Sequence, residues 1–119
     1  MAVASSLAVH QDRLVTGDSG WSSLGVTVAA THSEHSEMVR SVLPKALFLV
    51  LGYGAQGTLA KDGVRGFRRG PGGLEGGMIS SSRPILFPEG SCGAGLQRWK
   101  DGVRIALAKA TTELGEAVG

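Results

Sequence analysis

The sequence has 119 residues, of which 42% are hydrophobic and 18% are charged, and its formal net charge is +2. These values indicate one globular domain rather than a disordered chain, and the charge is too small to indicate nucleic-acid binding. The longest apolar run, residues 46–51, is far shorter than the ~20 residues of a membrane span, so we expect no membrane insertion.

A single cysteine, Cys92, lies in a glycine-rich segment. One cysteine cannot form an internal disulfide, which fits a reducing compartment, and we expect a cytoplasmic protein. No histidine lies near Cys92 in the sequence, so an incidental thiol is favoured over a catalytic nucleophile. The first nine residues are apolar but lack the basic region of a signal peptide.

Three short apolar runs indicate buried parallel strands, because they are almost continuously hydrophobic. These runs are Leu24–Ala30, Ala46–Leu51 and Gly77–Ser80, and helical patterns follow them at Ser33–Leu43, Thr58–Phe67 and Leu96–Leu114. The alternation of strands and helices predicts an α/β fold with right-handed crossovers. The strands begin 22 to 31 residues apart, close to the ~31 residues of one unit of a (β/α)8 barrel, so the chain holds at most four of eight units.

The helical patterns also predict which helix faces are buried. Thr31 and Glu34 have the spacing of a capping box before the first helix, and Pro44 ends that helix. Helical spacing places His35, Met38, Val39, Val42 and Leu43 on one face. On the last helix the same spacing places six residues on one face: Trp99, Val103, Ala106, Leu107, Ala110 and Leu114.

Two loops at consecutive strand ends favour an anion site. Gly52–Gly57 follows the second strand, and its glycines allow backbone N–H groups to approach an anion while Gln56 adds a side-chain donor. Ser80–Arg83 follows the third strand and ends in a guanidinium suited to phosphate. An ordinary tight turn explains either loop alone, but loops after the last two strands of a barrel commonly bind phosphate.

Two other motifs have weaker support. Gly52–Gly57 also matches the dinucleotide fingerprint G-x-G-x-x-G, but the only acidic residue near the required position, Glu75, precedes the next strand instead of ending it. His32 and His35 form an H-x-x-H pair without a third ligand at a set spacing, so helix capping and surface exposure explain them better than a metal does. We therefore expect no metal and no cofactor.

Three segments together resemble the bacterial type 2 orotidine 5′-phosphate decarboxylases. Residues 20–31, GWSSLGVTVAAT, are similar to the family pattern G-[YW]-S-S-x-G-x-V-V-G-A-T. Residues 48–57, FLVLGYGAQG, are similar to F-L-V-P-G-[YVI]-G-A-Q-G, and residues 81–85 to S-S-R-x-I. The three segments occur in the family order, and the resemblance spans about residues 8 to 110.

The resemblance implies a TIM barrel that acts as a homodimer and converts orotidine 5′-phosphate to UMP and CO2 in pyrimidine biosynthesis without a cofactor. Residues 1–119 would be its C-terminal portion, with the last three βα units of the barrel. Gln56 and Arg83 would hold the substrate phosphate, helped by backbone N–H groups at Gly57 and Ser82. Thr31 and Tyr53 are expected to line the substrate site.

The catalytic D-x-K-x-x-D of that family is absent from the sequence. Lys61 and Lys100 are each followed by aspartate, but both lie in helical patterns rather than at a strand end. Leu51 and Ala29 also replace a family proline and glycine. The resemblance therefore implies a truncated or split gene product, or a reading frame begun at an internal Met, that is inactive alone. A non-catalytic phosphate-binding or nucleotide-binding remnant stays open as the alternative.

An incomplete barrel also has an open inner face. Val26, Val28, Phe48 and Val50 alternate along the first two strands, so we expect them on surfaces that the missing strands would cover. Such exposure predicts that the isolated chain is oligomeric, molten or aggregated.

Overall fold

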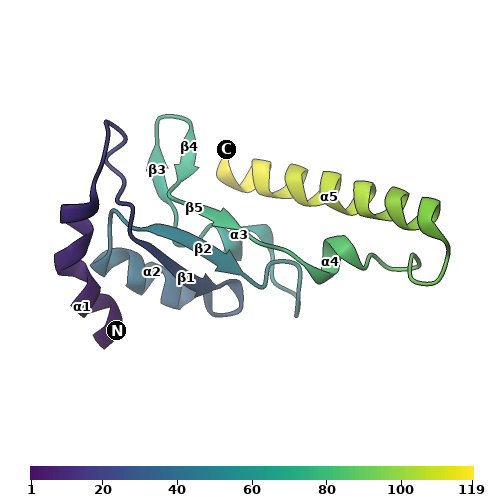
Figure 1. Cartoon of the computed structure of the whole chain (residues 1–119), viewed down its shortest axis with the longest axis horizontal. Coiled ribbons are helices and arrows are strands. Elements are labelled where there is room, and N and C mark those ends of the chain that lie inside the picture. The colour runs from purple at the N-terminus through teal and green to yellow at the C-terminus, as the bar shows by residue number, and fades with distance from the viewer.

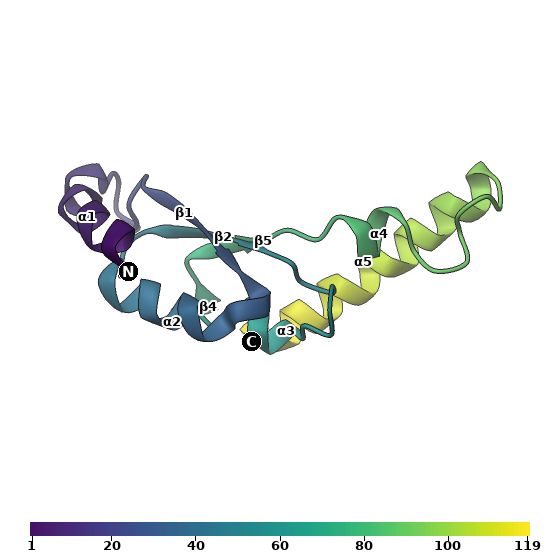
Figure 2. The ribbon, with the colours of Figure 1, turned by 90° about the horizontal axis from the view of Figure 1, so that it is seen from below.

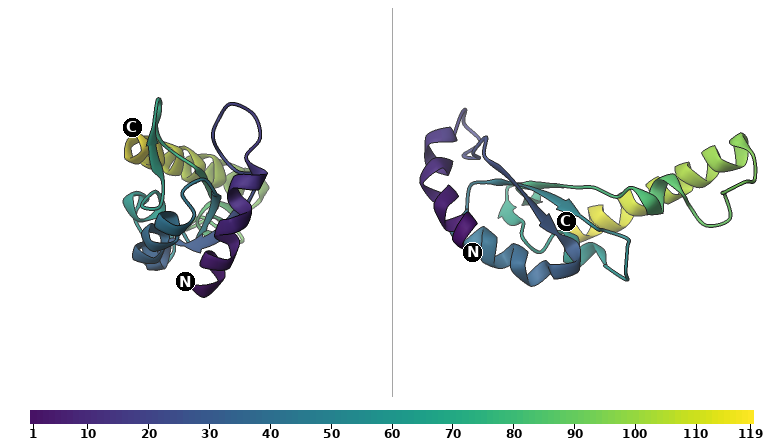
Figure 3. Two further views of the ribbon diagram at one scale, coloured as in Figure 1. Left: turned by 90° about the vertical axis from the view of Figure 1, so that its left-hand side faces the viewer. Right: turned by 60° about the horizontal axis from the view of Figure 1, so that its bottom comes forward.

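The computed structural model describes residues 1–119 and shows a mixed α/β fold (Figure 1). Its elements are α1 (Ala2–Gln11), η1 (Asp12–Leu14), β1 (Gly25–Ala29), η2 (Ala30–His32), α2 (Ser33–Val42), β2 (Leu47–Leu51), α3 (Ala60–Gly63), β3 (Arg68–Gly70), β4 (Gly73–Glu75), β5 (Gly77–Ile79), α4 (Arg83–Leu86) and α5 (Leu96–Val118). The molecule measures 51 × 29 × 21 Å, and much of α5 extends beyond the sheet (Figure 3). None of the helices combines the length and the hydrophobicity that crossing a membrane requires.

The three predicted strands form one parallel sheet in the order β1-β2-β5. Val26 lies opposite Phe48 between the first two strands, and Val50 lies opposite Ile79 between β2 and β5. Helices separate the strands along the chain, as the pattern predicted. The parallel α/β arrangement is thereby confirmed, and the two strand ends that carry the predicted loops, those of β2 and β5, lie at one edge of the sheet.

Only one face of this sheet is covered. Phe48 and Val50 are each 1% exposed, and α2 and α3 lie on their side of the sheet (Figure 2). The alternate residues form a surface that we call the open face: Thr27, Leu47, Leu49, Leu51 and Met78. Leu49 at its centre is 38% exposed and Met78 is 68% exposed.

The open face is therefore real, but the prediction of its residues was wrong. Val26, Val28, Phe48 and Val50 point to the covered face, where Phe48 and Val50 join the hydrophobic core. Strand periodicity separates the two sets of side chains but does not say which set meets the helices, and a shift by one residue exchanges them.

The buried face of α2 also differs from the prediction. His35 is exposed and Met38 is 44% exposed, whereas Ser33, Ser36 and Arg40 are buried. The small side chain at Ser36 makes room for the chain at Gly66, where an added Cβ would lie 2.9 Å from the Ser36 Cβ atom. The predicted capping box is absent as well, because the helix begins after His32 and no side chain caps it.

Arg40 takes the central position on that buried face. Its guanidinium donates to the carbonyl oxygens of Gly66 and Ala46 at 2.6 Å and of Gly76 at 3.0 Å, and it lies 3.8 Å from the centre of the Phe48 ring. Burial, followed by repulsion from Arg68, lowers the pKa of Arg40 to about 10. The side chain therefore stays charged at neutral pH and connects the amino ends of β2 and β5 to α2.

Three segments depart from their predicted form. The helix expected at Thr58–Phe67 is only the single turn α3, and a hairpin of β3 and β4 follows where a loop was expected. The indole of Trp21 packs on Gly76 and donates to Glu75 at 3.3 Å, which holds this hairpin against the sheet. Helix α5 extends beyond its predicted end, and Leu107 on it is 52% exposed rather than packed.

Candidate functional site

The glycine-rich loop after β2 and the serine-rich loop after β5 meet at the carboxyl ends of these two strands. The Ser81 hydroxyl donates to the Tyr53 carbonyl at 3.1 Å, and Gly54 lies against the ring of Pro84. Between the loops is a cavity of about 250 Å³. Its lining is Leu51, Gly52, Tyr53, Ala55, Ser80, Ser81, Ser82, Arg83 and Pro84. The structure thus brings together the two segments in which the sequence predicted an anion site.

Glycine is required at Gly54 for two reasons. Its φ of +79° is in the left-handed region, and a Cβ there would approach Pro84 Cγ to 3.1 Å. A larger residue would therefore push the two loops apart and change the cavity.

The first loop leaves several donors free. Its turns are closed by Ala55 N–H to the Gly52 carbonyl at 3.2 Å and by the Thr58 hydroxyl to the same carbonyl at 2.7 Å. The N–H groups of Gly54, Gln56 and Gly57 make no hydrogen bond within the protein. Successive backbone N–H groups in a turn conformation form concave anion-binding surfaces.

Gln56 has the only positive φ of any residue other than glycine, 53°. This conformation costs a residue with a Cβ roughly 1–2 kcal/mol, and such strain is concentrated at functional sites. The Gln56 side chain is exposed and lies outside the cavity lining. Its contact with an anion would therefore be made from the rim.

Arg83 is the first residue of α4, and its side chain has no polar partner within the protein. The guanidinium makes no ion pair or hydrogen bond, and the side chain is exposed at the cavity. The N–H groups of Ser81 and Ser82 also have no partner in the protein. A free guanidinium beside free N–H groups can accept a phosphate without first breaking an internal contact.

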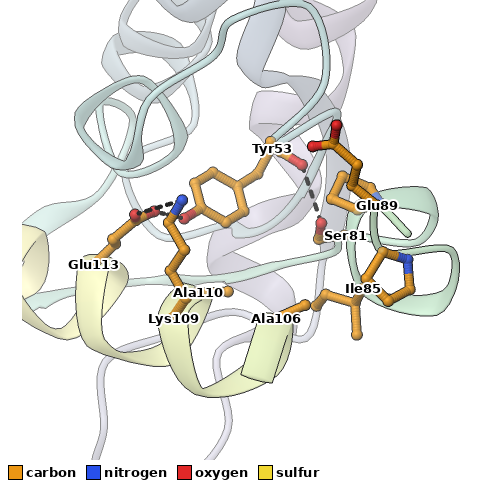
Figure 4. A pocket seen from close by; sticks show the side chains of 11 residues that line it. Tyr53, Ser81, Ile85, Glu89, Ala106, Lys109, Ala110 and Glu113 are labelled. Atoms are coloured by element: carbon orange, nitrogen blue, oxygen red, sulfur yellow. Dashed lines mark hydrogen bonds and ion pairs between the residues drawn. The ribbon is translucent and has the colours of Figure 1, made fainter. Parts of the chain in front are cut away.

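Thr31 and Tyr53 occupy different parts of this edge. Thr31 lies in η2 after β1, and its methyl group would be 3.8 Å from a Cβ placed on Gly52. The Tyr53 backbone lines the cavity, but its side chain extends toward α5 and donates to Glu113 Oε2 at 2.7 Å (Figure 4). Burial, then the hydrogen bond and negative charge of Glu113, raise the pKa of Tyr53 to about 12.

A second cavity of about 270 Å³ separates the Tyr53 loop from α5, as Figure 4 shows. Lys109 and Glu113 line it from the helix, with Nζ and Oε1 3.7 Å apart. Neither residue was predicted from the sequence. Their i, i+4 spacing was the available signal, but that spacing predicts only an exposed ion pair on any helix.

The structure treats the dinucleotide fingerprint and the H-x-x-H pair differently. Glu75 ends β4 of the hairpin and accepts from Trp21, rather than ending the sheet strand that follows the glycine loop, as the dinucleotide fingerprint would require. His32, Glu34 and His35, by contrast, come together with their ligand atoms within 4.8 Å of one another. Of the residues present, these three are the ones that could hold a metal ion.

Comparison with known proteins gives one consistent result. No family model matches the chain. Orotidine 5′-phosphate decarboxylase from Clostridium perfringens (strain SM101 / Type A) is 43% identical over 71 residues, which cover 60% of this chain and 23% of that enzyme. This chain is similar to part of the orotidine 5′-phosphate decarboxylases. The resemblance read from the three sequence motifs is thereby confirmed.

Two further decarboxylases extend the similarity. The Petrotoga mobilis enzyme is 36% identical over 91 residues, covering 76% of this chain and 30% of that enzyme. The Rhodopirellula baltica enzyme is 35% identical over 99 residues, covering 80% and 32% respectively. The chain thus spans about a quarter to a third of the length of these decarboxylases.

Proposed function

We propose that residues 1–119 are the C-terminal portion of an orotidine 5′-phosphate decarboxylase and form the last three βα units of its (β/α)8 barrel. The open face supports this proposal. In a closed barrel the inward side chains of all strands fill the interior, and Leu47, Leu49 and Leu51 would take that role here. Their present exposure of 38–42% is what removal of the remaining strands would leave.

The observation that carries the proposal is the convergence of the two loops on one cavity. Arg83 and the N–H group of Ser82 would bind the substrate phosphate from one side, and Gln56 with the N–H group of Gly57 from the other. Phosphate is remote from the carboxylate that leaves, so its binding energy can be used to stabilise the transition state at the reacting carbon. Thr31 would face the same substrate from the end of β1.

The reaction itself needs residues that this chain lacks. Breaking the bond to CO2 leaves an electron pair on the pyrimidine carbon, which a lysine of the family's D-x-K-x-x-D motif protonates. That motif is absent here. The chain would therefore contribute phosphate binding, and the missing barrel portion would supply proton transfer, without a cofactor. We also propose the family's homodimeric state and a cytoplasmic location.

The experiment joins this chain to the N-terminal portion of the Clostridium perfringens relative, up to the first matched residue. Loss of orotidine 5′-phosphate absorbance measures turnover, calorimetry with UMP measures binding, and circular dichroism verifies folding. Turnover well above that of each separate portion is expected. A folded fusion that binds UMP without turnover would instead favour a non-catalytic nucleotide-binding remnant. A folded fusion without UMP binding would exclude both functions.

A further inference from the structure

Three metal-ligating side chains gather where η2 passes into α2. His32 ends η2, while Glu34 and His35 belong to the first turn of α2. All three are exposed, and the two imidazole rings are stacked with centroids 5.5 Å apart and planes inclined by 25°. The helical turn therefore presents two ring nitrogens and a carboxylate on one side.

The spacing of these atoms is close to that of a coordination shell. Candidate ligand atoms of the three residues lie within 4.8 Å of one another. Ligands bound to one zinc ion at ~2.0–2.1 Å are at most ~4.2 Å apart. Neighbouring ligands of a tetrahedral zinc ion are ~3.4 Å apart, so the most widely separated pair needs to close by up to ~1.4 Å, which exposed residues achieve by rotations about their side-chain bonds.

No internal interaction competes strongly for the three side chains. Neither imidazole makes a hydrogen bond within the protein, and the Glu34 carboxylate has only a 3.9 Å contact with His32 Nδ1. The nearest guanidinium, that of Arg65, is engaged by Glu37 at 3.0 Å and by the Ser33 hydroxyl at 3.2 Å. Glu34 makes no ion pair with Arg65, although its charge helps to raise the pKa of that guanidinium.

We propose that His32, Glu34 and His35 bind one divalent late transition-metal ion, with Zn²⁺ as the expected ligand and water completing its shell. Two imidazoles and one carboxylate favour zinc, copper or nickel over magnesium and calcium, which prefer oxygen ligands alone. The site lies at the end of β1, directly after Thr31. It depends only on the end of η2 and the first turn of α2, and not on the proposed decarboxylase function.

The test is calorimetric titration of the 119-residue chain with Zn²⁺ alone. We expect one ion per chain and no binding of Mg²⁺. Loss of an outer-shell partner of a metal site costs roughly 10–100-fold in affinity, so His32→Ala and His35→Ala should each weaken binding by at least about tenfold. His10→Ala is the matched control, because His10 is an exposed histidine on α1 outside the cluster. Glu34→Gln should weaken binding less than either histidine change.

Electron paramagnetic resonance of the Cu²⁺ complex provides a second readout that does not depend on affinity. Coupling to two imidazole nitrogens is expected in the unchanged chain, and to one in His35→Ala. Equal Zn²⁺ affinity in the unchanged chain and His35→Ala would overturn the proposal, as would an equal loss in His10→Ala. Undiminished binding in concentrated denaturant would also overturn it, because the folded turn would then play no part.

Discussion

The hydroxyl of Tyr53 donates to Glu113 at 2.7 Å and so connects the loop after β2 to the C-terminal part of α5. The same tyrosine contributes backbone atoms to the cavity between the two strand-end loops. Helix α5 has no fully buried residue and packs mainly on α3 and α4. This single hydrogen bond is therefore a direct connection between the helix and the candidate phosphate loop.

Tyr53 is the only tyrosine in the chain, so absorbance of the phenolate reports its ionisation alone. We expect a pKa of about 12 in the folded chain against an ordinary value of 10.0. Because the folded state raises this pKa, the stabilisation from the contact is complete below pH 10 and declines as pH rises toward 12. Glu113→Gln removes the negative charge and should move the pKa back toward its ordinary value. Ionisation near pH 10 in the unchanged chain would contradict the hydrogen bond.

Arg40 is expected to be essential for the packing of α2 on the sheet. Arg40→Met keeps an apolar stem but removes the donor that Arg40 supplies to the carbonyls of Gly66 and Ala46, at about 1–3 kcal/mol for each buried acceptor. The Gly76 carbonyl keeps the Phe48 N–H as a donor. Hydrogen exchange of the β2 amides should accelerate strongly. Arg104→Met is the control, since the Arg104 side chain is 76% exposed and pairs only with Asp101. Equal exchange in the two variants would show that the carbonyl contacts contribute little.

The 119-residue chain alone should not decarboxylate orotidine 5′-phosphate. The physical reason is the missing lysine of the D-x-K-x-x-D motif, without which no group protonates the carbon after CO2 departs. The absorbance assay with purified chain should match a buffer blank. Turnover above that blank would mean that another residue of this chain donates the proton.

Arg83 and Gln56 should each contribute to phosphate binding in the fusion with the missing barrel portion. Arg83→Ala should weaken UMP binding by about 1.5–3 kcal/mol, the range for hydrogen bonds to charged groups. Gln56→Ala should weaken it less, because the amide is neutral and lies at the rim. Uridine, which lacks the phosphate, is the control ligand and should bind the three proteins equally. If UMP affinity is unchanged in both variants, the phosphate lies elsewhere.

The open face should make the isolated chain associate. Burying a leucine or methionine side chain fully contributes roughly 1.5–3 kcal/mol of favourable free energy, and association would bury the side chains of the open face. The edges of the sheet also present unpaired backbone groups to other chains. Sedimentation of the unchanged chain should show oligomers or aggregates. Leu49→Lys, at the centre of the open face, should raise the monomer fraction, whereas Val50→Lys on the covered face should prevent folding. A monodisperse 12.2 kDa unchanged chain would refute the half-barrel argument.

The sequence alone determined the features that depend on neighbouring residues. Short apolar runs located β1, β2 and β5, because continuous hydrophobicity distinguishes a buried parallel strand from its surroundings. The two loops after β2 and β5 followed from glycine and serine chemistry, and parallel strand order predicted that they would meet. The similarity to decarboxylases was likewise visible in three local motifs.

The tertiary structure decided everything that depends on which surfaces meet. Whether Phe48 or Leu49 faces the helices cannot be read from strand periodicity, because both sets of side chains are apolar. Nothing in the local sequence marks Arg40 as the donor to five backbone carbonyls, or Tyr53 as the partner of Glu113. These interactions join segments up to 60 residues apart, so their energies are set by packing rather than by local sequence.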